Sequence, residues 1–256
     1  MPYAELRLWA PATERRVDAQ TGLAEFVLDT LQSGGFTLQD GDGLVLAQKI
    51  VSKAEDRRVN LRDVEPSASA VQLAVKTGKD ERLVELILRE SSAVLRAQPG
   101  VLIVRHRLGF VCANAGIDQS NAGNADADEF ALLLPENPDA SAQRLREALL
   151  QRSGVRVAVL IADSLGRAWR QGTIGTAIGI AGAPALVDLR GRHDLDGRAL
   201  RSSELGFADE LASAASLLMG QAAEGRPIVL VRGLAWPCGD GRAVELIRSV
   251  EKDLFP

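Results

Sequence analysis

The sequence predicts a mixed fold of helices and strands, α+β or α/β, whose strand order cannot be read from the sequence. Several segments repeat apolar residues at helical spacing, and short apolar runs typical of strands lie between them. The chain has 256 residues, 46% apolar and 25% charged, so it can bury a sizeable core. We expect one domain over residues 1–256, with two intimate lobes that divide near residue 140, where "DEFALLLPENPDASAQ" has the composition of a connection.

The helices are predicted from apolar spacing and from residues that favour helix ends. Leu23, Phe26 and Leu31 repeat at helical spacing, and the glycines after them stop the first helix. Ser67 and Asp80 are plausible N-caps of two further helices. Helices are expected over 21–35, 67–78, 80–95, 140–154 (with Gly154 as its stop), 202–220 and 240–255.

The strands are predicted from short apolar runs. "VRVAVLIAD" ends in the carboxylate of Asp163, as a buried strand does where it meets its exit loop. "GVLIVRHRLGFVCAN" indicates two strands joined near Leu108 and Gly109. Further strands are expected over 44–52 and 226–234.

Composition and charge exclude several classes of protein. Aromatic residues make up 4% of the chain and the net charge is −4, so neither a base-stacking surface nor a positive field for nucleic acid or membrane is expected. The two cysteines, Cys112 and Cys238, form no disulfide framework and have no zinc spacing. The N-terminus lacks an apolar signal core, and the apolar run from Ile174 to Val187 is too short to span a bilayer. We therefore expect a soluble, cytoplasmic protein.

Four polar stretches could carry chemistry. They are "VCANAGIDQSNAG" with Asp118 and Asn121, "LIADSLGRAWRQG" with Asp163, Ser164, Arg167 and Arg170, "AQKIVSKAEDR" with Lys49 and Lys53, and "LLMGQAAEGRP" with Gln221, Glu224 and Arg226. Carboxylate, hydroxyl and amide oxygens are the ligands that Mg²⁺ and Mn²⁺ prefer, and substrate phosphates often complete their shell. If these stretches meet in space, they suit phosphoryl or acyl-phosphate chemistry.

Each of these residues also has a purely structural interpretation. Asp118 taken alone more often bonds its own backbone in a turn, and Asp163 could equally be a helix N-cap. Lys53 is more often a solvated lysine and Gln221 a plain loop residue. The glycines at 172, 175, 179 and 182 more often allow close packing than hold a phosphate. His106 and His193, the only histidines, are of a kind that is seldom catalytic. No phosphate-loop, dinucleotide-binding, nucleophile-elbow or zinc-protease motif is present.

Five segments together resemble one known family. "KIVSKAEDR", "VCANAGIDQSN", "ADSLGRAWRQGTIGTAIGIAG", "GRHDLDGRAL" and "LLMGQAAEG…VLVRGL" occur in the order found in the coenzyme F-420 γ-glutamyl ligases, from about residue 40 to residue 250. The resemblance implies an unusual two-lobed α+β fold and a homodimer. It also implies a ligase that adds L-glutamate to coenzyme F-420-0 and extends a γ-linked tail, with GTP consumed through an acyl phosphate. Mn²⁺ or Mg²⁺, expected as two ions, and K⁺ would assist.

The resemblance also implies site residues. The implied metal ligands are Asp118, Asp163, Ser164 (where many members carry a threonine) and Gln221. The implied nucleotide contacts are Gln48, Lys53, Asn121, Met219, Gly220, Gln221, Ala222, Ala223, Glu224 and Gly225. No further catalytic residue is assigned.

The sequence departs from the family pattern near its start. A Gly-Asp-Asp segment that helps hold the nucleotide is replaced by Asp18-Ala-Gln-Thr-Gly, which leaves the choice of GTP over ATP open. The longer two-domain members carry a C-terminal flavin-dependent reductase domain, and we expect that activity to be absent from this chain. Two alternatives to the ligase remain: a related metal- and nucleotide-dependent amide ligase acting on another acid, and a nucleotide-binding regulator.

Overall fold

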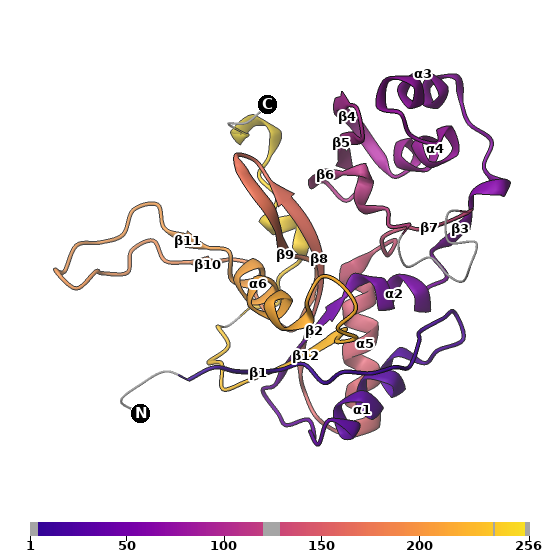
Figure 1. The fold of residues 1–256 in the computed structure, drawn as a ribbon. Coiled ribbons are helices and arrows are strands. Elements are labelled where there is room, and N and C mark those ends of the chain that lie inside the picture. The colour runs from indigo at the N-terminus through magenta and orange to yellow at the C-terminus, as the bar shows by residue number, and fades with distance from the viewer. Residues whose placement is uncertain (1–4, 120–128, 238, 254–256) are drawn as a thin grey trace.

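A computed structural model describes residues 5–119, 129–237 and 239–253, and it confirms the α+β class. Its centre is a five-stranded sheet in the order β1-β12-β2-β8-β9 (Figure 1). The strands are β1 (Arg7–Trp9), β12 (Ile228–Arg232), β2 (Gly43–Ala47), β8 (Ala158–Arg167) and β9 (Arg170–Ala181). The strands β2 and β8 run parallel, and every other neighbouring pair is antiparallel. The sequence alone did not indicate this order.

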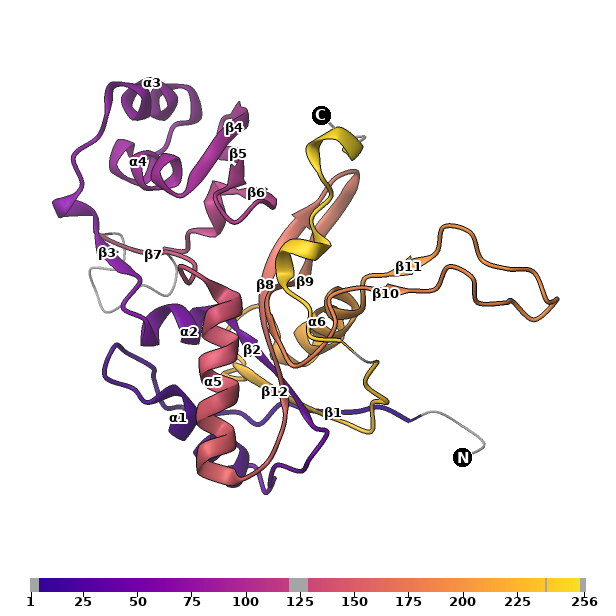
Figure 2. The same ribbon diagram turned by 180° about the vertical axis from the view of Figure 1, so that it is seen from behind.

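Helices cover both faces of the sheet because its strands alternate their buried side chains between two cores. Leu44 and Leu46 of β2 pack in a cluster with residues of α1 (Leu23–Ser33) and α5 (Pro138–Ser153). Val45 packs in a second cluster with α6 (Phe207–Met219). Figure 2 shows α5 and α1 along one side of the sheet. The helix α5 ends at Gly154 in the left-handed conformation, as predicted.

Two glycines of β9 let the helices approach the strand closely. A Cβ atom at Gly179 would lie 2.5 Å from the carbonyl oxygen of Pro138 in α5, and one at Gly175 would lie 2.4 Å from that of Ala212 in α6. Such distances leave no room for a side chain, so Gly175 and Gly179 serve packing, as the structural interpretation held. A Cβ atom at Gly172 would meet nothing within 4 Å, so for Gly172 that interpretation was wrong.

A small lobe is inserted between α2 (Gln48–Ala54) and α5. It is built from α3 (Ala68–Thr77), α4 (Glu81–Arg89) and a three-stranded sheet of β4 (Ser91–Gln98), β5 (Val101–His106) and β6 (Val111–Ala113). Ser67 and Asp80 cap the two helices through their side chains, as predicted. The lobe begins at β3 (Arg58–Asn60) and ends at β7 (Phe130–Leu132), which pair with each other (Figure 1). The division near residue 140 stays a prediction.

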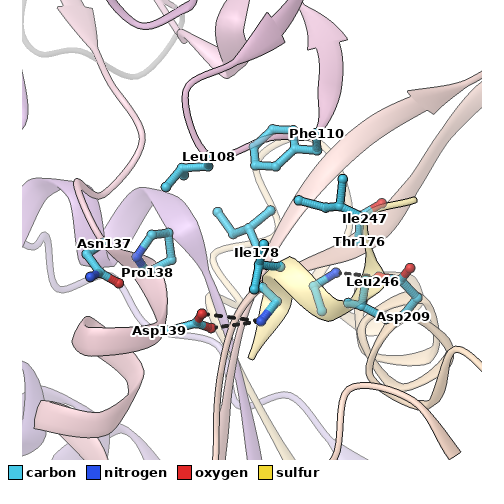
Figure 3. A pocket seen from close by; sticks show the side chains of 13 residues that line it. Leu108, Phe110, Asn137, Pro138, Asp139, Thr176, Ile178, Asp209, Leu246 and Ile247 are labelled. Carbon is cyan, nitrogen blue, oxygen red and sulfur yellow. Dashed lines mark hydrogen bonds between the residues drawn. The ribbon is translucent and has the colours of Figure 1, made fainter. Parts of the chain in front are cut away.

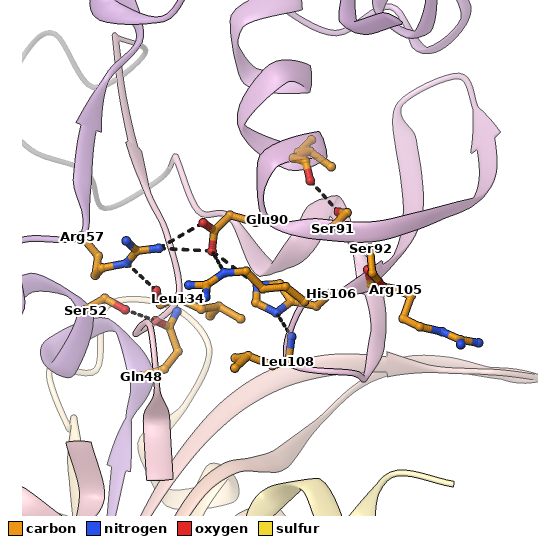
Figure 4. A network of polar contacts seen from close by, with 12 residues as sticks. Gln48, Ser52, Arg57, Glu90, Ser91, Ser92, Arg105, His106, Leu108 and Leu134 are labelled. Atoms are coloured by element: carbon orange, nitrogen blue, oxygen red, sulfur yellow. Dashed lines mark hydrogen bonds and ion pairs between the residues drawn. The ribbon is translucent and has the colours of Figure 1, made fainter. Parts of the chain in front are cut away.

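A network of polar contacts joins the small lobe to the central body at Glu90, the C-cap of α4 (Figure 4). Arg57 donates to both oxygens of Glu90 at 3.1 and 3.2 Å, and also to the carbonyl of Leu134 at 2.9 Å. Arg107 donates to Glu90 at 3.1 Å, and the buried His106 lies 3.6 Å from it. His106 is therefore a core residue of this junction, which agrees with the structural interpretation.

An arm projects from the central body between β9 and α6. It contains β10 (Val187–Asp188) and β11 (Glu204–Leu205), which pair antiparallel, and the chain between them extends far from the sheet (Figures 1 and 2). Most of its side chains are exposed, and that of Leu195 is fully so. Among the described residues, no helix has the length and apolar character needed to cross a membrane.

Four predicted elements were wrong in extent or kind. The strand expected over 44–52 ends at Ala47, and α2 begins at the next residue. The helix expected over 80–95 ends at Arg89, where β4 follows, because "SSAVLRAQ" pairs with β5. The helix expected over 240–255 is replaced by two short 3-10 helices, and the helix expected over 202–220 begins only at Phe207.

Candidate active site at the edge of the central sheet

Several polar segments meet where β2 and β8 end their parallel pairing. Ala47 lies opposite Ala162 in the register, so the next residues, Gln48 and Asp163, follow side by side. Because β12 is antiparallel to β2, it begins at this same edge, and the amide of Ala47 donates to the carbonyl of Pro227 at 2.9 Å. Ligands commonly bind at the carboxyl ends of parallel strands. The topology therefore gathers three of the four predicted stretches at one edge.

Asp163 occupies the middle of β8 rather than its exit loop, so both predictions for its local structure, strand end and helix N-cap, were wrong. The strand continues for four more residues because β9 pairs with it as a hairpin. Burial raises the pKa of Asp163 to about 6; the amide of Ser164, the charge of Lys49 and a hydrogen bond from Gln48 lower it, and the charge of Asp118 raises it. Because burial disfavours the ionised form of this carboxylate, an additional positive charge nearby would stabilise it.

Asp118 lies beside this carboxylate on a separate segment. Its amide donates to the carbonyl of Leu132 at 3.0 Å, and its own carbonyl accepts from the amide of Leu132 at 2.8 Å. This bridge continues the β3–β7 pairing and fixes Asp118 at the base of the small lobe. The carboxylate forms an ion pair with Lys49. The structure thus brings the two predicted metal-binding aspartates together, and Lys49 of α2 forms an ion pair with one of them, Asp118.

The helix α2 supplies three polar side chains to the cluster. Gln48 is buried, and its side-chain oxygen accepts from the hydroxyl of Ser52 at 2.9 Å (Figure 4). Burial lowers the pKa of Lys53, as do the charges of Lys49 and Arg16, while Asp118 raises it. Lys53 therefore lies among other cations, an arrangement that an anionic ligand would relieve.

The remaining predicted ligands are placed less directly. Ser164 is exposed and, as the next residue of the strand, it points to the opposite face of the sheet from Asp163. The structure therefore does not bring its hydroxyl to the Asp118–Asp163 pair. Asn121 lies outside the described residues. Both remain predictions of the family resemblance.

The loop from Met219 to Gly225 lies at the same edge of the sheet as the aspartates. It joins α6 to β12, its Gly220 has a φ of +76°, and Gln221 is exposed. The amide of Ala222 donates to Glu224 at 2.8 Å. The carbonyl of Gly225 accepts from the amide of Thr13 at 2.8 Å, so the loop also borders the divergent N-terminal segment. Gln221 stays a predicted ligand.

Sequence reasoning named Lys49 and Cys112 but gave neither a role in the site, and it missed Arg16. Lys49 is central because α2 begins directly after β2, which the predicted continuous strand concealed. Burial raises the pKa of the Cys112 thiol to about 12, and the charge of Asp163 adds to this. Cys112 is thus a protonated neighbour that packs between the small lobe and β8. No short motif distinguishes these residues.

The cluster fits a hard divalent cation that is shared with a phosphate. No group of three or more His, Cys, Asp or Glu side chains suited to a metal occurs within residues 5–119, 129–237 and 239–253. Asp118 and Asp163 provide two carboxylates that share one lysine, and burial disfavours the ionised form of one of them. Mg²⁺ or Mn²⁺ is commonly held by one or two carboxylates, with substrate phosphates and water completing the shell.

A pocket of about 150 Å³ lies elsewhere, between the tip of the β5–β6 hairpin, β9 and the starts of α5 and α6 (Figure 3). Its two carboxylates are occupied by backbone amides. Asp139 accepts from Ile180 at 2.8 Å and Ala243 at 3.1 Å, and Asp209 accepts from Ala177 at 2.9 Å. Burial raises the pKa of both aspartates. The two carboxylates accept hydrogen bonds from backbone amides of the edge strand β9, which is a structural role.

Comparisons with known proteins converge on one family. The model of the family described as F420-0:Gamma-glutamyl ligase matches residues 13–233. The chain is 44% identical to the Coenzyme F420:L-glutamate ligase of Methanothermobacter thermautotrophicus, over 93% of this chain and 94% of that protein. It is 44% identical to the protein of the same name from Methanopyrus kandleri, over 98% and 97%. The protein of that name from Archaeoglobus fulgidus is 43% identical over 89% of each chain.

Proposed function

The chain belongs to the F420-0:gamma-glutamyl ligase family, and on that premise we propose that it uses GTP to join L-glutamate to coenzyme F-420-0 and then extends a γ-linked glutamate tail. Its relatives are named as ligases, and the chain is an amide-bond-forming enzyme. The structural observation that supports the finer proposal is the pairing of Asp118 and Asp163, beside Gln48, Lys49 and Lys53, at one edge of the sheet.

The first proposed step activates the acceptor. A carboxylate oxygen of the acceptor attacks the γ-phosphorus of GTP, the bond to the β–γ bridging oxygen breaks, and GDP leaves with the electron pair. The product is an acyl phosphate. Lys53 lies among Lys49 and Arg16 and would place positive charge against the phosphate oxygens as they approach one another.

The second proposed step forms the amide. The glutamate amine attacks the acyl carbon, the carbon–oxygen bond to phosphate breaks, and inorganic phosphate leaves while the nitrogen releases a proton to solvent. Cys112 is buried beside Asp163, so that side of the site is closed to water, which would help to protect the acyl phosphate from hydrolysis.

Asp118 and Asp163 would hold Mn²⁺ or Mg²⁺, with Ser164 and Gln221 as further ligands. When bound there, a divalent cation neutralises the charge of the phosphate oxygens. Lys49 would then no longer be needed to balance Asp118, and its ammonium group could turn to the phosphates. A second divalent ion and K⁺ are part of the proposal on the family resemblance, as are nucleotide contacts from Asn121 and from the loop Met219–Gly225.

A homodimer is also proposed. The arm between Val187 and Leu205 extends away from the sheet with most of its side chains exposed, including Leu195. An isolated two-stranded ribbon is marginally stable in water, so a partner surface along the arm would account for its length. Light scattering of the full chain tests this directly.

The experiment that tests the proposed reaction is mass spectrometry of purified protein incubated with F-420-0, L-glutamate, GTP and Mn²⁺. We expect mass gains in whole glutamyl units that need both GTP and the metal ion, and ATP in place of GTP tests the nucleotide choice. Tight GTP binding without any gain would contradict the proposed acceptor. That result would favour another acid as the substrate, or a regulatory role.

A further inference from the structure

The first residue of α2 is a glutamine that lies beside one of the two paired aspartates. Ala47 ends β2 opposite Ala162 of β8, so Gln48 and Asp163 follow at the same level of the sheet. The side chain of Gln48 donates a hydrogen bond to the carboxylate of Asp163. This glutamine therefore contacts a carboxylate that is proposed to hold the metal ion.

The amide oxygen of Gln48 is also occupied. It accepts from the hydroxyl of Ser52 at 2.9 Å, one turn further along α2 (Figure 4). A serine within a helix often donates to a backbone carbonyl of the preceding turn, as Ser153 does to Leu149 at 2.8 Å. Ser52 donates instead to a side chain, so its hydroxyl supports Gln48.

These two contacts leave one orientation for the amide group of Gln48. An ionised carboxylate can only accept hydrogen bonds, so the amide nitrogen must face Asp163 and the amide oxygen must face Ser52. Gln48 is 2% exposed and Ser52 is fully buried. A buried amide that is bonded at both ends has little freedom to turn, and it offers no open surface to a ligand. Each group in this series thus orients the next.

The position of Ser52 is fixed by the junction between the small lobe and the central body. The carbonyl of Ser52 accepts from the amide of Arg57 at 2.9 Å. The guanidinium of Arg57 donates in turn to the carbonyl of Leu134 and to Glu90 (Figure 4). The series from Ser52 to Asp163 therefore starts at a well-anchored point, which favours precise placement of the carboxylate.

We propose that Gln48 is a positioning residue that orients the carboxylate of Asp163 for the divalent cation, and that Ser52 holds the Gln48 amide for this task. This inference rests on the proposed function, because it takes Asp163 to bind the metal ion. A hydrogen bond to a ligating carboxylate restricts its rotation, so less conformational entropy is lost when the metal ion binds. The assignment replaces the nucleotide contact that the family resemblance implied for Gln48.

The test measures Mn²⁺ binding by calorimetry on the unaltered protein and on Gln48→Met, which keeps the length of the side chain but removes both hydrogen bonds. We expect the Kd for Mn²⁺ to rise about tenfold or more, the usual scale for loss of a partner of a metal ligand. With Mn²⁺ raised to saturation, the KM for GTP should change less than about twofold, because Gln48 does not contact the nucleotide.

A double-variant cycle separates positioning from general damage to the fold. Ser52→Ala should raise the Kd for Mn²⁺ less than Gln48→Met does. Adding it to Gln48→Met should raise the Kd no further, because Ser52 acts only through Gln48. The control is Thr30→Val, which removes another buried helical hydroxyl, one that donates to the carbonyl of Phe26 at 2.7 Å, and it should leave the Kd unchanged.

Three results would overturn the proposal. They are an unchanged Kd for Mn²⁺ in Gln48→Met, a KM for GTP that rises as much as that Kd does, and effects of the two single variants that add in full. If Gln48→Met does not fold, Ser52→Ala alone must still raise the Kd at an unchanged KM for GTP. If the unaltered protein binds no Mn²⁺, the proposed metal site fails and this inference fails with it. If the unaltered protein binds Mn²⁺ normally and Gln48→Met binds it equally well, this inference alone fails.

Discussion

Two clusters of partly buried charge, one around Glu90 and one around Asp163, differ in how well each carboxylate is satisfied. Glu90 accepts hydrogen bonds from Arg57 and Arg107 and lies against His106. Burial raises its pKa, but these partners lower it to about 2. Asp163 has a charged lysine nearby that is paired with Asp118, and its pKa rises to about 6.

The difference shows how burial can serve either structure or function. At Glu90 two guanidinium groups satisfy the carboxylate, so the cluster is complete and connects the small lobe to the body. At Asp163 the surroundings favour a further cation, which is the expected state of a site that receives a ligand. The following predictions separate the two clusters experimentally.

The largest expected effect is on turnover. Asp163→Asn removes a charge proposed to hold the divalent ion, so glutamate addition should fall by at least about 10³-fold. Because the buried charge is itself unfavourable without metal, the free energy of unfolding of the metal-free protein should stay the same or increase. Activity assays and urea unfolding measure the two effects.

A matched control is Asp209→Asn, which alters another aspartate whose pKa is raised by burial. Its carboxylate accepts from the amide of Ala177 and lies outside the proposed site. It should retain metal-dependent turnover and show little change in stability, because the side-chain oxygen of Asn can still accept from Ala177. Retained activity in Asp163→Asn would contradict the assignment of the metal site.

The second effect is on stability. Glu90→Gln leaves Arg57 and Arg107 without their common carboxylate, so the free energy of unfolding should fall by about 3–5 kcal/mol. Glu85→Gln, on the same helix, alters a carboxylate held by Arg89 and the amide of Ser67 and should cost about 1 kcal/mol. Urea unfolding compares the two variants. Equal losses in the free energy of unfolding would show that the Glu90 network stabilises the protein no more than the contacts of Glu85 do.

The two clusters should also respond to pH with opposite sign. The folded pKa of Glu90 lies below its ordinary value of 4.5, so its contribution is present above that pH and is lost as pH falls toward about 2. The loss amounts to about 3 kcal/mol at most. The folded pKa of Asp163 lies above its ordinary 3.8, so the metal-free protein loses stability as pH rises from about 4 to about 6.

These slopes can be isolated by difference. Unfolding of the metal-free protein is measured from pH 3 to pH 7 and compared with Glu90→Gln and Asp163→Asn at each pH. The first variant should lack the acidic loss and the second should lack the loss near pH 5. If the free energy of unfolding depended on pH in the same way in all three proteins, the predicted difference between the Glu90 and Asp163 clusters would be wrong.

The smallest expected effect concerns Lys49. Its charge lowers the pKa of Asp163, so Lys49→Met should raise that pKa further, by less than about one unit because the lysine is partly exposed. The pH midpoint of Mn²⁺ binding, followed by calorimetry, should move upward accordingly. A midpoint that moves downward would show that Lys49 competes with the metal ion more than it aids ionisation.

The sequence predicted those elements whose signals are local. Ser67 and Asp80 cap their helices, Gly154 ends α5, and the two strands around Leu108 form a hairpin, because caps and turns depend on a few neighbouring residues. Sequence reasoning failed where pairing between segments distant in the chain determines the secondary structure. "SSAVL" continues a helical pattern yet joins β5, and "QKIVS" continues an apolar strand yet turns into α2.

The candidate site was predicted in its residues but not in its geometry. The resemblance singled out Asp118 and Asp163. The structure brings the start of α2 beside Asp163 because β2 and β8 pair in parallel over a separation of more than a hundred residues, and the bridge between Asp118 and Leu132 places Asp118 at the base of the small lobe. No periodicity encodes that pairing. For the same reason Lys49 had no assigned role, and the position of Asp163 within a hairpin could not be anticipated from a run that resembles a strand end.

The β3–β7 pair has a consequence for how the chain folds. Asn60 lies opposite Phe130, so the small lobe leaves and returns to the body at one point, and most of its contacts close within its own segment. The central sheet instead requires β1 to find β12, which joins Arg7 to Arg232. Contacts between distant residues form slowly. The lobe should therefore fold early and independently, and the sheet edge that gathers Asp118 and Asp163 should be among the last parts to assemble.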